Sequence, residues 1–336
     1  MADSLYGPGG FFVRDGGGPA AHFRTSATQS RVLAQALARL LVRTDQALGT
    51  PARLDLVDVG AGRAELLTGM LAELHPALID RLRVTAVELA PRPSGLDERI
   101  SWAGGIPPGV EGLLIATEWL DNVPLDVVEV DGTGEPRYVL VGADGTEAPG
   151  PRVEPGDAAW LRRWWPLTGA ATGVRAEIGA PRDAAWRSAV ASVRRGVALT
   201  IDYGHTAGCR PAFGTLTGFR DGRQVRPVPD GTCDLTAHVA MDSLAAAGAE
   251  VAGRVPAAVA APDGVPPTLQ TQREALPGLG VTGGRPPLTL AGTDPAGYVR
   301  ALAGASAAAE LLDPAGLGGH YWLTQPVGVT LGHTEA

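Results

Sequence analysis

The chain has 336 residues, 45% of them hydrophobic, which is enough for one large α/β domain with an elaboration or for two domains. Its net charge of −8 argues against non-specific nucleic-acid binding, because such binding requires a basic surface. The chain contains arginine but no lysine. This excludes a P-loop lysine, a pyridoxal-phosphate Schiff base and any lysine nucleophile.

The sequence also bears on the compartment. No uncharged apolar run approaches the length of a membrane span, and residues 1–10 lack the basic end and apolar segment of a signal peptide. Cys209 and Cys233 form no close pair, which is typical of a reducing compartment. We therefore expect a soluble, cytoplasmic protein without a membrane span; its oligomeric state is left open.

The predicted elements begin with a glycine-rich segment, residues 1–30, in which aromatic side chains such as Tyr6 and Phe11 suggest an ordered flap. A helix follows, with leucines at helical spacing between residues 33 and 41. We expect residues 1–50 to form a flap and a helix that pack on the core.

The next stretch has the pattern of a nucleotide-type cofactor site. Leu54–Val59 is an apolar run of strand length, and Gly60-Ala61-Gly62 follows at once. A helix is predicted from Ala64 to Leu74, then a second strand, Leu82–Val87, which leads to Glu88. Glycines allow a tight strand-to-helix turn, and a carboxylate at Glu88 suits the hydroxyl donors of a ribose.

The residue after this turn discriminates between cofactors. A dinucleotide fingerprint needs a third glycine at position 65, where this chain has Glu65, and a carboxylate repels phosphates. S-adenosylmethionine has no phosphate and carries a positive sulfonium, so the spacing favours a methyltransferase over a dehydrogenase. A tight strand-to-helix turn of any other α/β protein explains this stretch about equally well.

The later elements complete a predicted doubly wound sheet. We expect a core at residues 51–206 with an insertion at about 145–182, and a C-terminal elaboration at 207–336 that completes the sheet and the substrate side. The remaining predicted strands are near Ile100–Trp102 and at Gly112–Ala116, Val127–Val130, Tyr138–Val141, Val197–Ile201 and Tyr321–Leu323, and the remaining predicted helices span residues 183–195, Leu235–Ala247 and Pro295–Leu312.

Two acids after the predicted strand at 112–116 are candidates for chemistry. Glu118 and Asp121 lie three residues apart in the loop that leaves this strand, so one helical turn would put both carboxylates on one side. Such a pair can hold a cationic group and accept its proton. Alternatively, Asp121 caps a helix and Glu118 is a solvated surface acid. We favour the functional interpretation for the pair.

A second candidate segment, Asp202 to His205, follows the predicted strand at 197–201 and could close the substrate side. A lone histidine such as His205 is as readily a structural residue as a base. The spacings of His205 with Cys209 and of Cys233 with His238 could chelate zinc, but no Cys-x-x-Cys supports this, so no metal site is predicted.

The sequence resembles the MidA-like class I S-adenosylmethionine methyltransferases, which include a mitochondrial complex I assembly factor that methylates an arginine. The resemblance covers most of the chain and rests on Tyr6-Gly7 with His22–Ser26, on Asp58–Arg63, on Glu118–Pro124, and on two late segments, Asp202–Gly204 and Asp234–Val239. Departures include Asp58, Ala61 and Ala64, where the family usually has glutamate, proline and a third glycine.

The resemblance implies a Rossmann-like class I methyltransferase fold, with Glu118 and Asp121 as catalytic residues. The cofactor site is predicted to comprise Asp58, Gly60, Ala61, Gly62, Arg63, Glu88 and Leu89, and the substrate side Asn122, Asp202, Tyr203, His205 and His238.

The expected activity is methylation of an arginine nitrogen in a protein, by family analogy a respiratory complex I subunit. Two alternatives stay open. One is a methyltransferase acting on a small molecule, and the other is a non-catalytic assembly factor that retains the cofactor fold.

Overall fold

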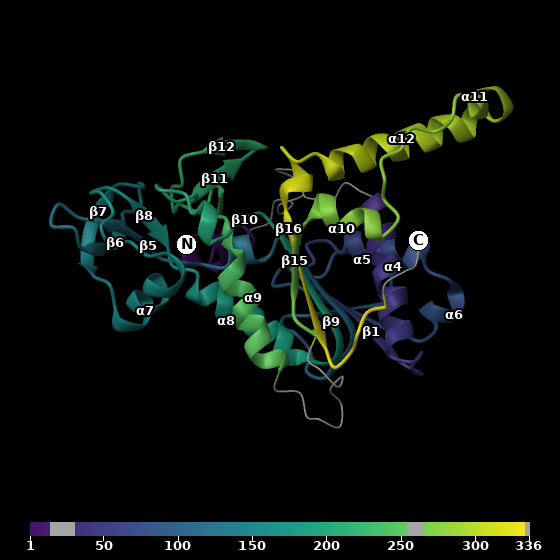
Figure 1. Ribbon diagram of the computed structural model, residues 1–336, viewed down its shortest axis with the longest axis horizontal. Coiled ribbons are helices and arrows are strands. Elements are labelled where there is room, and N and C mark those ends of the chain that lie inside the picture. Colours follow the sequence, from purple (N-terminus) through teal and green to yellow (C-terminus); the bar gives the residue numbers. More distant parts are fainter. Residues whose placement is uncertain (14–30, 254–264, 333–336) are drawn as a thin grey trace.

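A computed structural model describes residues 1–13, 31–253 and 265–332 (Figure 1). The sequence element at His22–Ser26 therefore lies outside the described residues. Within them, no helix is both long and apolar enough to cross a membrane.

The core is a seven-stranded sheet with the order β15-β16-β9-β4-β1-β2-β3. Strands β1, β2, β3, β4 and β9 are parallel, and β16 runs antiparallel between β9 and β15. Because β1 pairs with β2 on one side and β4 on the other, the strand order reverses there. A crevice for a ligand forms at such a point, beyond the carboxyl ends of the strands. The strands are β1 (Leu54–Val59), β2 (Leu82–Val87), β3 (Ile100–Ala103), β4 (Val110–Thr117), β9 (Val193–Asp202), β15 (Thr268–Thr271) and β16 (Tyr321–Val327).

Helices cover both faces of this sheet, so the central strands are buried (Figure 1). All six residues of β1 are buried, which explains why its sequence is an almost continuous apolar run. On one face lie α4 (Arg31–Ala47), α5 (Glu65–Glu73), α6 (Pro76–Ile79) and α10 (Gln272–Gly278); on the other lie α8 (Ala180–Ser192) and α9 (Met241–Ala252).

A separate antiparallel sheet, in the order β7-β6-β5-β8, forms a lobe beside the core (Figure 1). Its strands are β5 (Val127–Val130), β6 (Pro136–Val141), β7 (Glu147–Arg152) and β8 (Arg175–Glu177), and α7 (Pro155–Trp164) packs against the sheet. The sequence placed an insertion at about 145–182, but the structure begins this lobe at β5. The predicted insertion thus contains β7, α7 and β8, while β5 and β6 precede it; alternating apolar residues look alike in a core strand and in a strand of a separate sheet.

The C-terminal part adds short strands and a projecting arm. A helix was predicted over Leu235–Ala247, but its first residues form β13 and pair with β11, so α9 begins only at Met241. Helix α12 (Pro295–Leu312) has the predicted bounds and extends away from the body (Figure 1). The other elements are α1 (Ala2–Tyr6), η1 (Leu120–Asn122), β10 (Gly204–His205), η2 (Ala207–Cys209), β11 (Thr217–Arg220), β12 (Arg223–Val225), β13 (Asp234–Thr236), β14 (Val239–Ala240), α11 (Thr289–Thr293) and η3 (Leu317–Gly319).

Three central strands approach each other too closely for side chains at two glycines. A Cβ at Gly112 would lie 2.0 Å from the carbonyl oxygen of Asp55, and one at Gly196 would lie 2.0 Å from that of Gly112. Their φ values, 153° and 134°, are also ones that other residues rarely adopt.

We therefore expect Gly112→Ala to destabilise the protein by about 3 kcal/mol or more, through overlap with the backbone and φ strain. Urea unfolding measures the loss. The control is Gly156→Ala in α7, where a Cβ meets nothing within 4 Å and should leave stability unchanged or slightly higher. Equal stabilities for both variants would contradict the prediction.

Candidate active site

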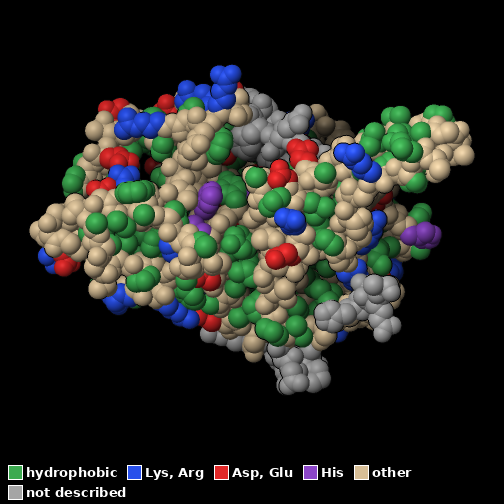
Figure 2. Space-filling model, turned by 45° about the horizontal axis from the view of Figure 1, so that its top comes forward, with side chains coloured by type: hydrophobic (Ala, Val, Ile, Leu, Met, Phe, Trp, Pro, Cys, Tyr) green, Lys and Arg blue, Asp and Glu red, His purple; other side chains and the backbone are tan. Residues whose placement is uncertain are grey.

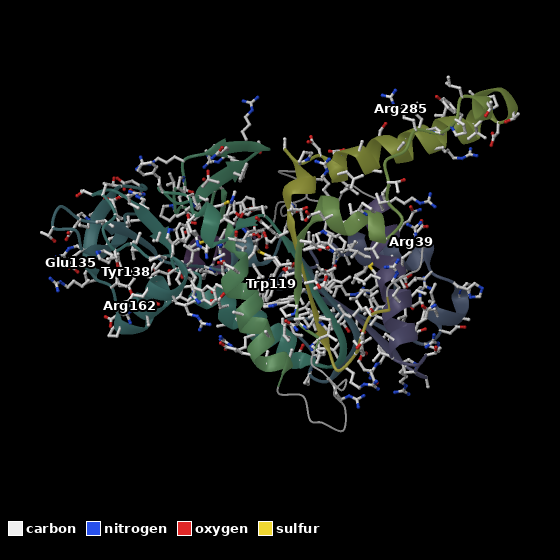
Figure 3. The ribbon with its side chains drawn as sticks, in the orientation of Figure 1. Arg39, Trp119, Glu135, Tyr138, Arg162 and Arg285 are labelled. Atoms are coloured by element: carbon white, nitrogen blue, oxygen red, sulfur yellow. The ribbon has the colours of Figure 1, made fainter. Side chains whose placement is uncertain are left out.

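A cavity of about 1370 Å³ lies where the strand order reverses. Its walls come from the ends of β1, β2 and β4 and from later segments, including residues 59–63, 87–91, 117–119 and 121–124. Trp119 lies at the centre of the molecule, between the core and the lobe that carries Tyr138 (Figure 3). The cavity thus occupies the position that the topology predicts for a ligand.

The glycine turn after β1 forms one wall of the cavity. Gly60 and Gly62 have positive φ values of 73° and 57°, and Gly60 donates a 2.9 Å hydrogen bond to the carbonyl of Val87. A Cβ at Gly62 would have only Glu65 Oε2 nearby, at 4.0 Å, so the main chain is open to a ligand. Ala64 also adopts a left-handed conformation, with φ 63°, at the position where the resembled family has a glycine.

Glu88 is fixed beside this turn by three amides. Its Oε2 accepts a hydrogen bond from Gly62 N at 3.0 Å, and its Oε1 accepts from Leu89 N at 2.7 Å and from Ala90 N at 3.1 Å. A carboxylate has about four acceptor positions, so one remains for a ribose hydroxyl. Asp58 lies buried beneath the turn, and burial, with the charges of Glu88 and Glu65, raises its pKa to about 8.

The charge of the cavity wall fits a sulfonium nucleoside better than a dinucleotide. Among the described lining residues the only arginine is Arg63, whereas the acids are Glu65, Glu88, Glu118, Asp121, Glu310 and Asp313. Acidic side chains are visible near the base of α12 in Figure 2. Such a wall repels the phosphates of NAD and favours the positive sulfonium of S-adenosylmethionine.

Glu118 lies directly after β4 in a strained conformation. Its φ is 49°, and its amide donates a 2.8 Å hydrogen bond to the carbonyl of Ile201 in β9. Non-glycine residues in this region cost free energy and are concentrated at functional sites. Its Oε1 lies 4.0 Å from Nδ1 of His320, and both side chains are mostly buried at the cavity wall.

Asp121 is held inside the η1 turn. Its Oδ2 accepts hydrogen bonds from the hydroxyls of Tyr203 and of Thr236, the latter at 2.6 Å, and burial raises its pKa. Asp202 in turn accepts hydrogen bonds at 3.0 and 3.2 Å from the amides of Leu120 and Asp121. Asp202 therefore holds the η1 turn through these two amides, and it does not line the cavity. The two predicted acids therefore both line the cavity but have different partners. Asp121 accepts a hydrogen bond from Tyr203, whereas Glu118 lies beside His320.

The other predicted substrate-side residues differ in position. His238 lines the cavity, with its ring centroid 5.2 Å from that of Tyr203. Asn122 also lines it, but its amide donates a 2.8 Å hydrogen bond to Asp234. His205 is buried away from the cavity, and burial, together with the Arg210 charge, lowers its pKa to about 3.

The described residues contain no group of three or more side chains that could hold a metal ion.

His320 and Thr236 lie at the cavity wall but were not predicted as site residues. Burial, together with the charge of His238, lowers the pKa of His320 to about 4, so its imidazole is neutral near pH 7. One signal could have found this residue. His320 immediately precedes β16, and because β16 is antiparallel, its first residue pairs with the last residue of β9, at the cavity end of the sheet. For Thr236 the sequence offered one signal, its position in the segment Asp234–Val239 that carries the family resemblance.

The raised pKa of Asp58 predicts a pH effect on stability. The folded protein holds a proton that the unfolded chain releases near pH 4, so this contribution to stability is complete below about pH 4 and is lost as pH rises to about 8. Between those values the wild type should lose up to about 1.4 kcal/mol of unfolding free energy per pH unit relative to Asp58→Asn. Urea unfolding across this range tests this, and parallel pH profiles of the two proteins would show that Asp58 titrates normally.

Comparison with known proteins identifies the family of this chain. Residues 36–259, more than half of the chain, match the family described as "Putative S-adenosyl-L-methionine-dependent methyltransferase". No curated protein matches significantly. A crystal structure of a superfamily member from Burkholderia thailandensis, bound to S-adenosyl-homocysteine, is 27% identical with a TM-score of 0.75, and the match covers 98% of this chain and 87% of that one.

A native crystal structure from the same superfamily and organism is 26% identical, with a TM-score of 0.74 and coverage of 99% and 87%. These similarities confirm the predicted Rossmann-like methyltransferase fold and the cofactor. The chain therefore belongs to this family of S-adenosylmethionine-dependent methyltransferases.

Proposed function

We propose that the protein transfers the methyl group to a guanidinium nitrogen of an arginine in a protein substrate. The observation that supports this most is Glu118, a carboxylate held by a strained backbone at the cavity wall, between the glycine turn and His320. The resemblance to arginine-methylating proteins points the same way, and a respiratory complex I subunit is the expected substrate by that analogy.

The chemistry places a specific demand on Glu118. S-adenosylmethionine, when bound, supplies an electrophilic methyl group on a sulfonium. A guanidinium is always protonated near neutral pH and is a poor nucleophile until it loses a proton. The Glu118 carboxylate would accept hydrogen bonds from the guanidinium, localise its charge and take up the proton that leaves nitrogen as the N–C bond forms. Asp121 would act through Tyr203, which it orients at the same wall.

The size of the cavity favours a large acceptor. Typical ligand pockets measure roughly 300–1,000 Å³, whereas this cavity measures about 1370 Å³. It therefore has room for the cofactor and for an arginine side chain. A small cationic metabolite is the alternative acceptor.

Methyl transfer in a cell extract tests the proposal. Wild-type protein would be incubated with radiolabelled S-adenosylmethionine and with extract fractions separated into proteins and small molecules. We expect label in protein, located on arginine by mass spectrometry. Label confined to the small-molecule fraction, or to another residue type, would refute arginine methylation.

Cofactor binding should depend on the open backbone at Gly62. In Gly62→Val, the new side chain would fill the ligand's approach and force an unfavourable φ, so binding of S-adenosyl-homocysteine should be lost while most of the fold remains. Calorimetry with S-adenosyl-homocysteine and with NAD measures this. Binding of NAD by the wild type, or undiminished binding by the variant, would contradict the assignment of this wall.

Glu118→Gln separates the chemistry from cofactor binding. The amide keeps the shape but loses the charge, so affinity for S-adenosyl-homocysteine should be nearly unchanged while methyl transfer falls by about a hundredfold or more. Asp121→Asn should also lower the rate of methyl transfer. If the hydrogen bonds of Asp121 mainly hold the η1 turn, the melting temperature should fall as well.

The matched control for Glu118→Gln is Glu135→Gln on the outer lobe, which should retain full activity (Figure 3). Wild-type rates in both Glu118→Gln and Asp121→Asn would exclude the carboxylate mechanism.

A further inference from the structure

Arg182 in α8 is a fully buried arginine with an unusual set of partners. Its exposed fraction is 1%, yet its hydrogen bonds go to backbone carbonyls. Nε donates to Val123 O at 3.1 Å, Nη1 donates to Ala237 O at 2.8 Å and to His238 O at 2.9 Å, and Nη2 donates to Asp121 O. One guanidinium thus binds two segments that are more than a hundred residues apart in sequence.

Burial of this arginine costs desolvation free energy, which its hydrogen bonds to the surrounding loops must offset. A guanidinium stays charged in a protein, and a buried charge without a paired carboxylate pays a large desolvation penalty. Within the described part of the chain, no carboxylate oxygen lies within 4.0 Å of its nitrogens, although the charges of Asp121, Glu177 and Asp202 act on it from further away. The guanidinium is planar and its N–H groups point in fixed directions, so it can donate to several fixed carbonyls at once. A lysine ammonium cannot match this geometry.

The four carbonyls belong to the two loops that form the acceptor side of the cavity. The loop after β4 contributes Asp121 and Val123 to the cavity wall, and the loop after β13 contributes His238. The loops also contact each other, because the amide of Ala237 donates a 3.3 Å hydrogen bond to the carbonyl of Asp121. Thr236 adds a hydrogen bond to the Asp121 carboxylate.

The cofactor side of the cavity is held by different groups. Its glycine turn is fixed by hydrogen bonds to Val87 and Glu88, at the end of β2, and within the described residues Arg182 makes no hydrogen bond to that turn. A change at Arg182 should therefore disturb one wall and leave the other in place.

We propose that Arg182 is a positioning residue for methyl transfer, which fixes the two acceptor-side loops relative to each other without contributing to the cofactor site. By holding the loop after β4, Arg182 sets the positions of Glu118 and of Asp121, the hydrogen-bond partner of Tyr203. By holding the loop after β13, it sets the position of His238. This role is independent of which molecule accepts the methyl group.

Hydrogen exchange on the full-length protein tests the proposal without a known acceptor. In Arg182→Lys and Arg182→Met, amide exchange in residues 118–124 and 234–239 should increase by about tenfold or more, whereas residues 54–64 and 82–90 should be unchanged. Affinity for S-adenosyl-homocysteine should stay within about twofold of wild type. Lysine should preserve more protection than methionine, because it retains some donors.

The control is Arg187→Lys, on the same helix, where the side chain is exposed and pairs only loosely with Glu250 at 3.4 Å. Exchange that accelerates uniformly along the chain, or loss of S-adenosyl-homocysteine binding, would mean that Arg182 only stabilises the fold and would overturn the proposal. Unchanged exchange at both loops in either variant would overturn it as well. Once an acceptor is known, Arg182→Lys should lower kcat and leave the KM for S-adenosylmethionine unchanged.

Discussion

The pairing of β1 with β2 on one side and with β4 on the other determines where this protein can bind a ligand. Helices cover both faces of the sheet, so a small molecule has access only beyond the strand ends, and the reversal of strand order opens a crevice there. The register depends on close backbone contact between Asp55, Gly112 and Gly196, which only glycines allow. The glycine turn and Glu118 leave the ends of β1 and β4, and both are thereby placed on the crevice.

The carboxyl groups around the crevice belong to two classes. Asp58, Asp121, Asp202 and Asp234 are buried, and burial raises the pKa of each of them. Three of them, Asp121, Asp202 and Asp234, accept hydrogen bonds from neighbouring loops and so shape those loops. Asp121 also lines the cavity, but its Oδ2 is engaged by Tyr203 and Thr236, whereas Glu88 and Glu118 are wall acids at positions where a carboxylate can meet a hydroxyl or a cation. An acidic composition in this region therefore does not mean that every acid takes part in chemistry.

Local sequence patterns predicted the first strands of the core and the turn after β1 well. The strands Leu54–Val59 and Leu82–Val87, the turn between them and Glu88 are contiguous in the sequence, so spacing and periodicity suffice. The bounds of α12 were also correct, because its proline start and apolar periodicity are local signals.

The acceptor half depends on contacts that no local pattern reveals. His205 follows a buried strand as a catalytic residue would, but the short pairing of β10 with β14 turns its ring toward Trp165 and Arg210. Asp202 looked like a substrate ligand and instead binds two amides of the η1 turn. Arg182 gave no signal at all, since its partners are carbonyls, which every residue possesses.

This difference between the two halves follows the order of the chain. The wall that we propose for the cofactor is built from residues 59 to 106, which form one continuous unit of strands and helices. The acceptor wall combines the loop after β4 with segments near residues 203, 236 and 320, brought together by β9, β13 and the antiparallel β16. Changes in these later segments can alter the shape and charge of the acceptor wall while the glycine turn and Glu88 keep their hydrogen bonds. In the proposed assignment, cofactor binding and acceptor recognition therefore depend on different segments of the chain, and the two properties can be tested with different variants.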